Sequence, residues 1–144
     1  MMPSITSYLS LDENRNVIYA AVHLNGIQSI NLSANPITYS AFSVSVSGMS
    51  SDPYGLYYSL SSDTLYVADY SSSKIFNIRL ANSTVSSWSS SISCNILGDT
   101  TTANLNKPIN VVYGNNRFYF VDEGAGQTNK ILTYVPRKCI LFLF

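Results

Sequence analysis

Residues 65–78, LYVADYSSSKIFNI, decide the fold of this chain of 144 residues, because they describe two short apolar strands joined by a tight polar turn. The same order returns at residues 118–134, FYFVDEGAGQTNKILTY, and in a weaker form at residues 18–30, IYAAVHLNGIQSI. Repeats of about this length that consist of strands alone are typical of β-propellers. The repeat therefore predicts a propeller architecture.

The three copies divide the chain into units. Their equivalent tyrosines lie 47 and 53 residues apart, at Tyr19, Tyr66 and Tyr119. The units run at about residues 4–47, 52–90 and 105–144 of one propeller segment. The predicted fold class is all-β, a partial β-propeller of about three four-stranded antiparallel blades, of the six-bladed type if completed.

Turn-forming residues separate the expected strands of each unit. The first unit is expected to form strands at residues 5–10, 17–22, 26–32 and 37–44. In the second unit they are residues 54–60, 64–69, 74–80 and 84–90, and in the third they are 109–113, 117–122 and 129–135, with 139–144 as a candidate outer strand. Central blade strands are expected to be apolar on both faces.

The composition of the chain argues against some classes of binding partner. Hydrophobic residues make up 46% of the chain, enough for a core, whereas charged residues are only 11%, with eight basic and eight acidic side chains. Binding to nucleic acid or to an anionic membrane surface relies on a cluster of cations, so both are disfavoured. No stretch reaches the roughly 20 apolar residues of a membrane span. The first residues do not resemble a signal peptide, and the compartment stays open, an extracellular parent protein included.

Few residues suit catalysis or metal binding. Cys94 and Cys139 lack the spacing of a zinc or redox site, and we expect plain thiols, although a disulfide between them stays open. His23 is the only histidine, and its position in a turn predicts a side chain that faces solvent. Nucleophilic hydrolases need a base beside the nucleophile. The sequence therefore predicts no catalytic residue, no metal and no cofactor.

The second unit resembles the NHL repeat family of β-propellers. The family motif has a Pro-x-Gly-aliphatic turn, a Leu-Tyr-Val-Ala-Asp strand and a basic-aliphatic pair, and Pro53, Gly55, Tyr66, Asp69 and Lys74 stand at its positions. The resemblance extends over about residues 4–136 and implies the propeller fold.

The other two units match the motif less completely. The third unit continues it through Tyr119, Asp122 and Lys130, but Asn110 replaces the motif glycine. The first unit has Val22 in place of the aspartate and Gly26 in place of the lysine, so both are lost together. This joint loss indicates that Asp69 and Asp122 are structural, accepting hydrogen bonds from the turn backbone or from the neighbouring lysine.

Three units do not close a propeller, which has about four to eight blades. Two blade faces would then need a cover. We consider three explanations: missing blades in a longer chain, which we favour, a six-bladed ring made from two copies as a homodimer, or an open array with modified end units.

The leading functional hypothesis is a non-enzymatic scaffold that binds a protein or peptide through loops at one rim. The candidate contact residues lie in turns, namely Tyr70, Asn115, Asn116, Glu123 and Gln127. The alternative is a part or subunit of a propeller hydrolase or lyase with a metal in the central channel. RNA binding, known for some NHL domains, would need a basic rim, for which the chain offers only Lys107, Arg117, Lys130, Arg137 and Lys138.

Overall fold

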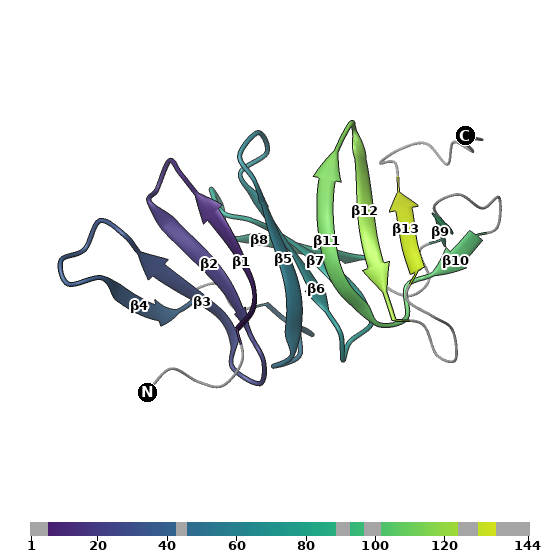
Figure 1. The fold of residues 1–144 in the computed structure, drawn as a ribbon, viewed down its shortest axis with the longest axis horizontal. Helices are drawn as coiled ribbons and strands as arrows, with labels where there is room; N and C mark the ends of the chain where they lie inside the picture. The colour runs from purple at the N-terminus through teal and green to yellow at the C-terminus, as the bar shows by residue number, and fades with distance from the viewer. Residues whose placement is uncertain (1–5, 43–45, 89–92, 97–101, 124–129, 135–144) are drawn as a thin grey trace.

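The computed structural model describes residues 6–42, 46–88, 93–96, 102–123 and 130–134, which form β-strands and no helix. The strands make three antiparallel sheets, two of four strands and one of five (Figure 1). The all-β prediction is confirmed. Within the described residues, no helix is long and apolar enough to cross a membrane.

Each sheet begins with an inner strand and continues outward. The first sheet is β1 (Thr6–Asp12), β2 (Val17–Val22), β3 (Gly26–Asn31) and β4 (Thr38–Ala41). The second is β5 (Pro53–Ser59), β6 (Thr64–Asp69), β7 (Lys74–Arg79) and β8 (Thr84–Trp88). The third contains β11 (Pro108–Gly114), β12 (Arg117–Asp122) and β13 (Lys130–Tyr134), followed outward by β9 (Ser93–Ile96) and β10 (Thr102–Asn104).

The third sheet differs from the expectation at its outer edge. In the first two sheets the fourth strand follows the third along the chain, but here β9, which precedes β11, pairs with β13. Ile96 lies opposite Leu132 and Asn95 opposite Thr133. Residues 93–96 and 102–104, which belonged to no expected unit, therefore complete this sheet, and the strand expected at 139–144 lies outside the described residues.

The three inner strands carry the same irregularity. The register with the second strand shifts between Thr6 and Tyr8, between Pro53 and Gly55, and between Pro108 and Asn110. Each inner strand thus has one extra residue, which is Ser7, Tyr54 or Ile109, in the manner of a β-bulge. Because the bulge recurs at Asn110, the loss of the motif glycine there does not change the local register.

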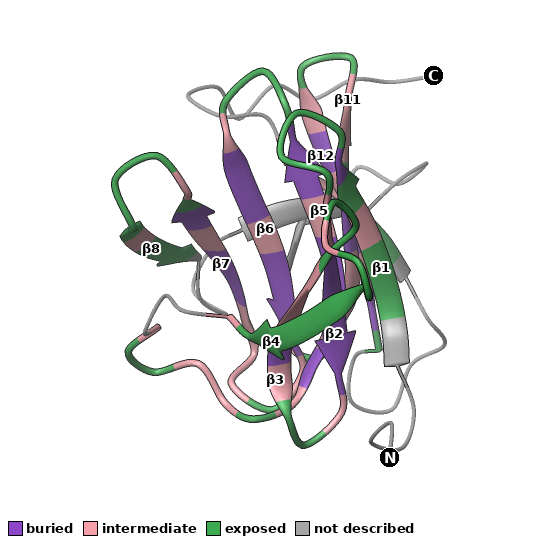
Figure 2. Cartoon of the chain, turned by 90° about the vertical axis from the view of Figure 1, so that its left-hand side faces the viewer, coloured by how far each residue is buried: buried purple, intermediate pink, exposed green. Residues whose placement is uncertain are grey.

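The cores lie between the sheets. β5 contacts β1 on one side and β11 on the other, so the second sheet stands between the other two (Figure 1). Figure 2 shows β6 buried along most of its length, whereas β4 is exposed. The first core comprises Tyr19, Ala21, Ile27, Leu56, Tyr58, Leu65, Val67, Phe76 and Ile78. The second comprises Ala68, Ile75, Leu105, Val111, Phe118, Phe120 and Leu132.

Gly55 explains how closely two inner strands approach. A Cβ atom at this position would lie 2.6 Å from both the Asn110 Cα and the Ile109 carbonyl oxygen. Real Cβ atoms do not come so close to backbone, so only glycine lets β11 approach β5 in this way. The glycine of the motif is thus a packing requirement between two sheets.

Candidate functional site

The turns of the molecule form two rims. The upper rim in Figure 1 consists of residues 13–16, 60–63 and 115–116, which join the first two strands of each sheet. At the lower rim lie the turns at 23–25 and 70–73, the segments 46–52 and 105–107 that lead into β5 and β11, and Glu123.

The candidate contact residues divide between these rims. Tyr70 and Glu123 lie at the lower rim, whereas Asn115 and Asn116 lie at the upper one. The two asparagines have φ angles of 49° and 58°, so the tight turn itself accounts for their presence. Gln127 lies outside the described residues. The five residues therefore do not form one surface.

A row of rings crosses the lower rim. Tyr54, the bulge residue of β5, stacks on Tyr70 with ring centroids 4.8 Å apart and an interplanar angle of 26°. His23 meets Tyr54 edge-on at 6.0 Å, and the Lys107 Nζ lies 5.0 Å from the centroid of the Tyr70 ring. We call these four residues the rim row. Since they come from the β2–β3 turn, from the second sheet and from the approach to β11, the row spans all three sheets.

The rim row combines ring faces with solvent access. A bulge re-aims side chains at the end of a strand, which accounts for Tyr54 reaching Tyr70 in place of the core. Both tyrosines are half-buried and Lys107 is exposed. Hydrogen bonding with Tyr70 raises the pKa of the Lys107 ammonium and so favours its charged form.

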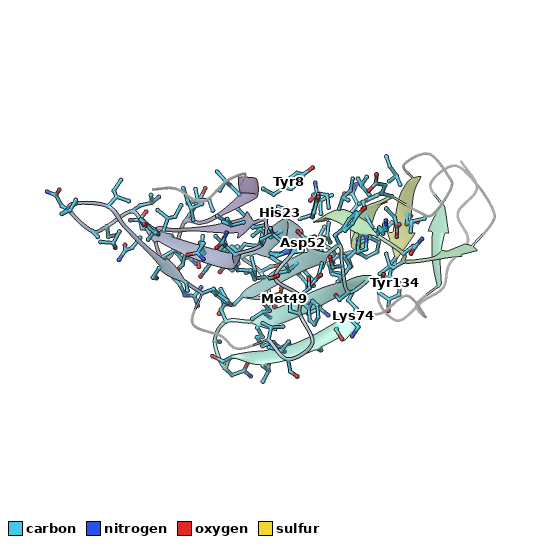
Figure 3. The ribbon with its side chains drawn as sticks, turned by 90° about the horizontal axis from the view of Figure 1, so that it is seen from below. Tyr8, His23, Met49, Asp52, Lys74 and Tyr134 are labelled. Atoms are coloured by element: carbon cyan, nitrogen blue, oxygen red, sulfur yellow. The ribbon has the colours of Figure 1, made fainter. Side chains whose placement is uncertain are left out.

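The Asp52 carboxylate links the first two sheets beside the rim row. His23 Nδ1 hydrogen-bonds with one carboxylate oxygen of Asp52, and the Ser71 hydroxyl donates to the other at 3.0 Å. Figure 3 shows His23 and Asp52 close together. His23 lies in a turn, as expected, but it is paired with a carboxylate. Because the carboxylate stands between imidazole and hydroxyl, this group lacks the base–nucleophile contact of a hydrolase.

Two buried carboxylates hold the segments that lead into the inner strands. Asp69 accepts hydrogen bonds from the backbone N–H and the hydroxyl of Ser50, both at 2.6 Å, and from the Ser72 N–H at 3.1 Å. Asp122 accepts from the N–H groups of Asn106 and Lys107 at 2.7 and 3.0 Å. These contacts agree with a structural role, and the one through Lys107 also positions the rim row.

Lys74 and Lys130 are the lysines that were expected to lie beside these two carboxylates. Among the ion pairs of the described residues, none joins Lys74 to Asp69. The side chain of Lys130 lies outside the described part of the chain. The shortest hydrogen bonds to Asp69 come instead from Ser50, in the segment before β5, which was not among the expected partners.

An unexpected network stands at the upper rim. Arg15 Nη1 donates to Asp12 at 2.7 Å and to Asp63 at 2.6 Å, and Nη2 donates to the second Asp63 oxygen at 2.8 Å. The Tyr58 hydroxyl donates to Asp63 at 2.9 Å. The pKa of Tyr58 is raised to about 12, mainly by burial and secondly by its hydrogen bond to Asp63. The hydrogen bond from Arg15 lowers the pKa of Asp63. The network joins the first sheet to the second.

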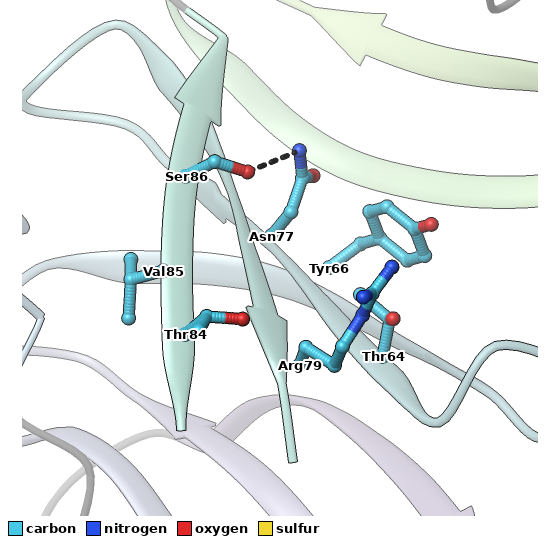
Figure 4. A pocket seen from close by; sticks show the side chains of 7 residues that line it. All are labelled: Thr64, Tyr66, Asn77, Arg79, Thr84, Val85 and Ser86. Carbon is cyan, nitrogen blue, oxygen red and sulfur yellow. Dashed lines mark hydrogen bonds between the residues drawn. The ribbon is translucent and has the colours of Figure 1, made fainter. Parts of the chain in front are cut away.

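A polar hollow lies on the face of the second sheet (Figure 4). It has a volume of about 320 Å³, and its walls are Thr64, Tyr66, Asn77, Arg79, Thr84, Val85 and Ser86. The Asn77 amide donates to the Ser86 hydroxyl at 3.3 Å, while its carbonyl oxygen is buried without a partner. The walls offer hydroxyls, an amide and one guanidinium, which suit a small polar molecule, but no charged side chain among them is buried.

In the part of the chain that the structure describes, no three His, Cys, Asp or Glu residues gather closely enough to hold a metal ion. Cys139 and the side chain of Cys94 lie outside that part, so the expectation of plain thiols stays a prediction.

No protein-family model fits the chain, and no curated protein matches it. The resemblance to NHL repeats therefore depends on the motif residues and stays a prediction.

Proposed function

We propose that this chain is an NHL-like propeller segment without enzymatic activity, which binds a protein or peptide along the rim row. The observation that carries the proposal is the stacked pair Tyr54 and Tyr70, extended by His23 and Lys107 across three sheets and open to solvent. Tyrosine rings supply large contact areas at small cost in conformational entropy, and they are enriched among the residues that dominate binding energy.

The charges beside the rings favour a polypeptide partner. Lys107 is a cation at one end of the row, while Asp52 and His23 form a paired polar group at the other. Such a surface suits an apolar or aromatic side chain on the rings with a carboxylate near Lys107. Nucleic acid would need several cations to neutralise its phosphates, and the row contains one lysine.

Selection from a displayed library of random peptides tests this proposal. Enriched peptides are synthesised, and their dissociation constants are measured by calorimetry with the wild-type chain and with Tyr70→Ala. We expect Tyr70→Ala to weaken binding about tenfold or more, as at other interface tyrosines. Tyr70→Phe keeps the ring and should retain most of the affinity.

The matched control is Glu13→Ala, an exposed residue of the opposite rim, which should leave the dissociation constants unchanged. Circular dichroism of each variant verifies the fold. Peptides that bind Tyr70→Ala as tightly as the wild type would overturn the rim row as the binding site. A folded chain that enriches no peptide would overturn the proposed function itself.

A further inference from the structure

We infer that two copies of this chain associate through the free faces of the first and third sheets and close into one ring. This inference does not depend on the rim row. It concerns the two sheet faces that have no partner sheet within the described residues.

The free face of the first sheet is apolar. Cross-strand pairing aligns Leu11 with Ile18, Ile18 with Ile30, and Ile30 with Tyr39, so these four side chains form one row over four strands. A second row starts at Leu9, which pairs with Ala20. Leu9 is 59% exposed and Tyr39 is 65% exposed, although most large apolar side chains of this size are buried in the rest of the molecule. We call this surface face 1.

The free face of the third sheet is apolar over two cross-strand rows, and Arg117, which lies opposite Gly114, stands in the row beside them near the upper rim. Val112 pairs with Tyr119 and Tyr119 with Thr133. The neighbouring row contains Val121 and Ile131, which lie opposite each other. Asn110 pairs with Val121 along the backbone, but its Cα and its amide oxygen lie against Gly55 of the second sheet. Val112 is 45% and Ile131 is 47% exposed. We call this surface face 3.

The chain already forms the same contact twice. The second sheet meets the first through the row Tyr58, Leu65, Ile78 and Val85, whose register matches the Leu11 row of face 1. Toward the third sheet it presents the row Tyr57, Tyr66, Asn77 and Ser86, whose register matches the Val112 row of face 3.

Equivalent tyrosines lie at both internal contacts. Tyr19 of the first sheet meets Tyr58 with ring centroids 6.1 Å apart, and Tyr66 of the second meets Phe118 at 4.7 Å. Tyr119 is the third member of this series. Face 3 thus corresponds to the side of a sheet that packs onto the following sheet, and face 1 corresponds to the side that packs onto the preceding sheet. Because these two kinds of side meet at both internal contacts, face 1 and face 3 should fit each other.

The arrangement of the sheets identifies a second copy as the occupant. In Figure 3 the first sheet extends to the left, the third to the right and the second below them, so both free faces look to the side away from the second sheet. A second copy can be placed by half a turn about an axis that runs parallel to the inner strands. Its face 3 then meets face 1 of the first copy, and its face 1 meets face 3 of the first copy. Closed two-fold assemblies of this kind are the commonest among soluble oligomers.

Light scattering during size exclusion tests the inference. We expect a folded species of twice the chain mass of 15.8 kDa. Leu11→Lys places a charge on face 1 and Ile131→Lys places one on face 3, and each should yield monomer at the concentration where the wild type is dimeric. Leu60→Lys is the control, because Leu60 is an exposed leucine in an upper-rim turn outside both faces, and this variant should stay dimeric.

Mixing the two lysine variants tests which faces meet. In a mixed pair one junction carries no lysine, so the double-mass species should partly return. A dimer that only one of the two lysines disrupts would overturn the pairing of face 1 with face 3. A folded wild-type monomer, verified by circular dichroism, would overturn the second copy as occupant and favour further sheets of a longer polypeptide as the cover.

Discussion

At the scale of single residues, Gly55 makes the sharpest prediction. Gly55→Ala would place a methyl group 2.6 Å from the backbone of β11. We expect a loss of about 1–3 kcal/mol in the free energy of unfolding, the usual range for overpacking, because β5 and β11 must move apart. Thermal unfolding measures the change, and Gly114→Ala is the control, since its Cβ would meet no atom within 4 Å. Equal effects of the two substitutions would contradict the packing role of Gly55.

Tyr58 predicts how stability responds to alkaline pH. Its pKa is raised from 10.0 to about 12, so the folded state holds the phenol proton more firmly than the unfolded state does. The resulting stabilisation is complete below pH 10 and is lost as the pH rises toward 12. Urea unfolding across this range should show a steep fall in stability, shallower in Tyr58→Phe. Burial also raises the pKa values of Tyr19 and Tyr66, so a smaller slope should remain.

At the scale of strands and sheets, Arg15 predicts how firmly the first sheet is held. Its guanidinium joins Asp12 of β1 to Asp63 beside β6, and Asp12 is fully buried. Arg15→Ala should cost about 1–3 kcal/mol, since it removes a partner from a buried carboxylate. Hydrogen exchange should quicken in β1 to β4 more than in β6 and β7.

Arg79→Ala is the matched control for this experiment. Arg79 is exposed and takes part in none of the ion pairs of the described residues. Its removal should leave exchange in the first sheet unchanged. Uniform quickening over all sheets in Arg15→Ala would show that the network supports the whole molecule and not one junction.

Particular elements show how far the sequence predicts this fold. β6 was predicted with its bounds, because its apolar run is closed by turn residues on both sides. β9 was not predicted, since its four residues contain little apolar pattern and its pairing with β13 is distant along the chain. In the rim row, Tyr70 was a candidate, but Tyr54 was not, because its direction depends on a bulge and on the neighbouring sheet.

At the scale of the whole molecule, the three sheets form two similar junctions. Face 1 and face 3 correspond to the two sides of such a junction. The interior is therefore not one core but a series of cores, each shared by two sheets. Stability in such repeats comes from units and from junctions between neighbours. Each end sheet has one junction and the second sheet has two, which explains why the second sheet is the most deeply buried.

The position of β9 affects the order in which the chain can fold during synthesis. The first two sheets gain their fourth strand only when β4 and β8 leave the ribosome, after the strands that they join. For the third sheet the fourth strand has already been made when β13 emerges, because β9 precedes it. Chains fold from the amino end as they are synthesised. All five strands of the third sheet have therefore been synthesised as soon as Tyr134 is free, and β13 can pair at once with β9.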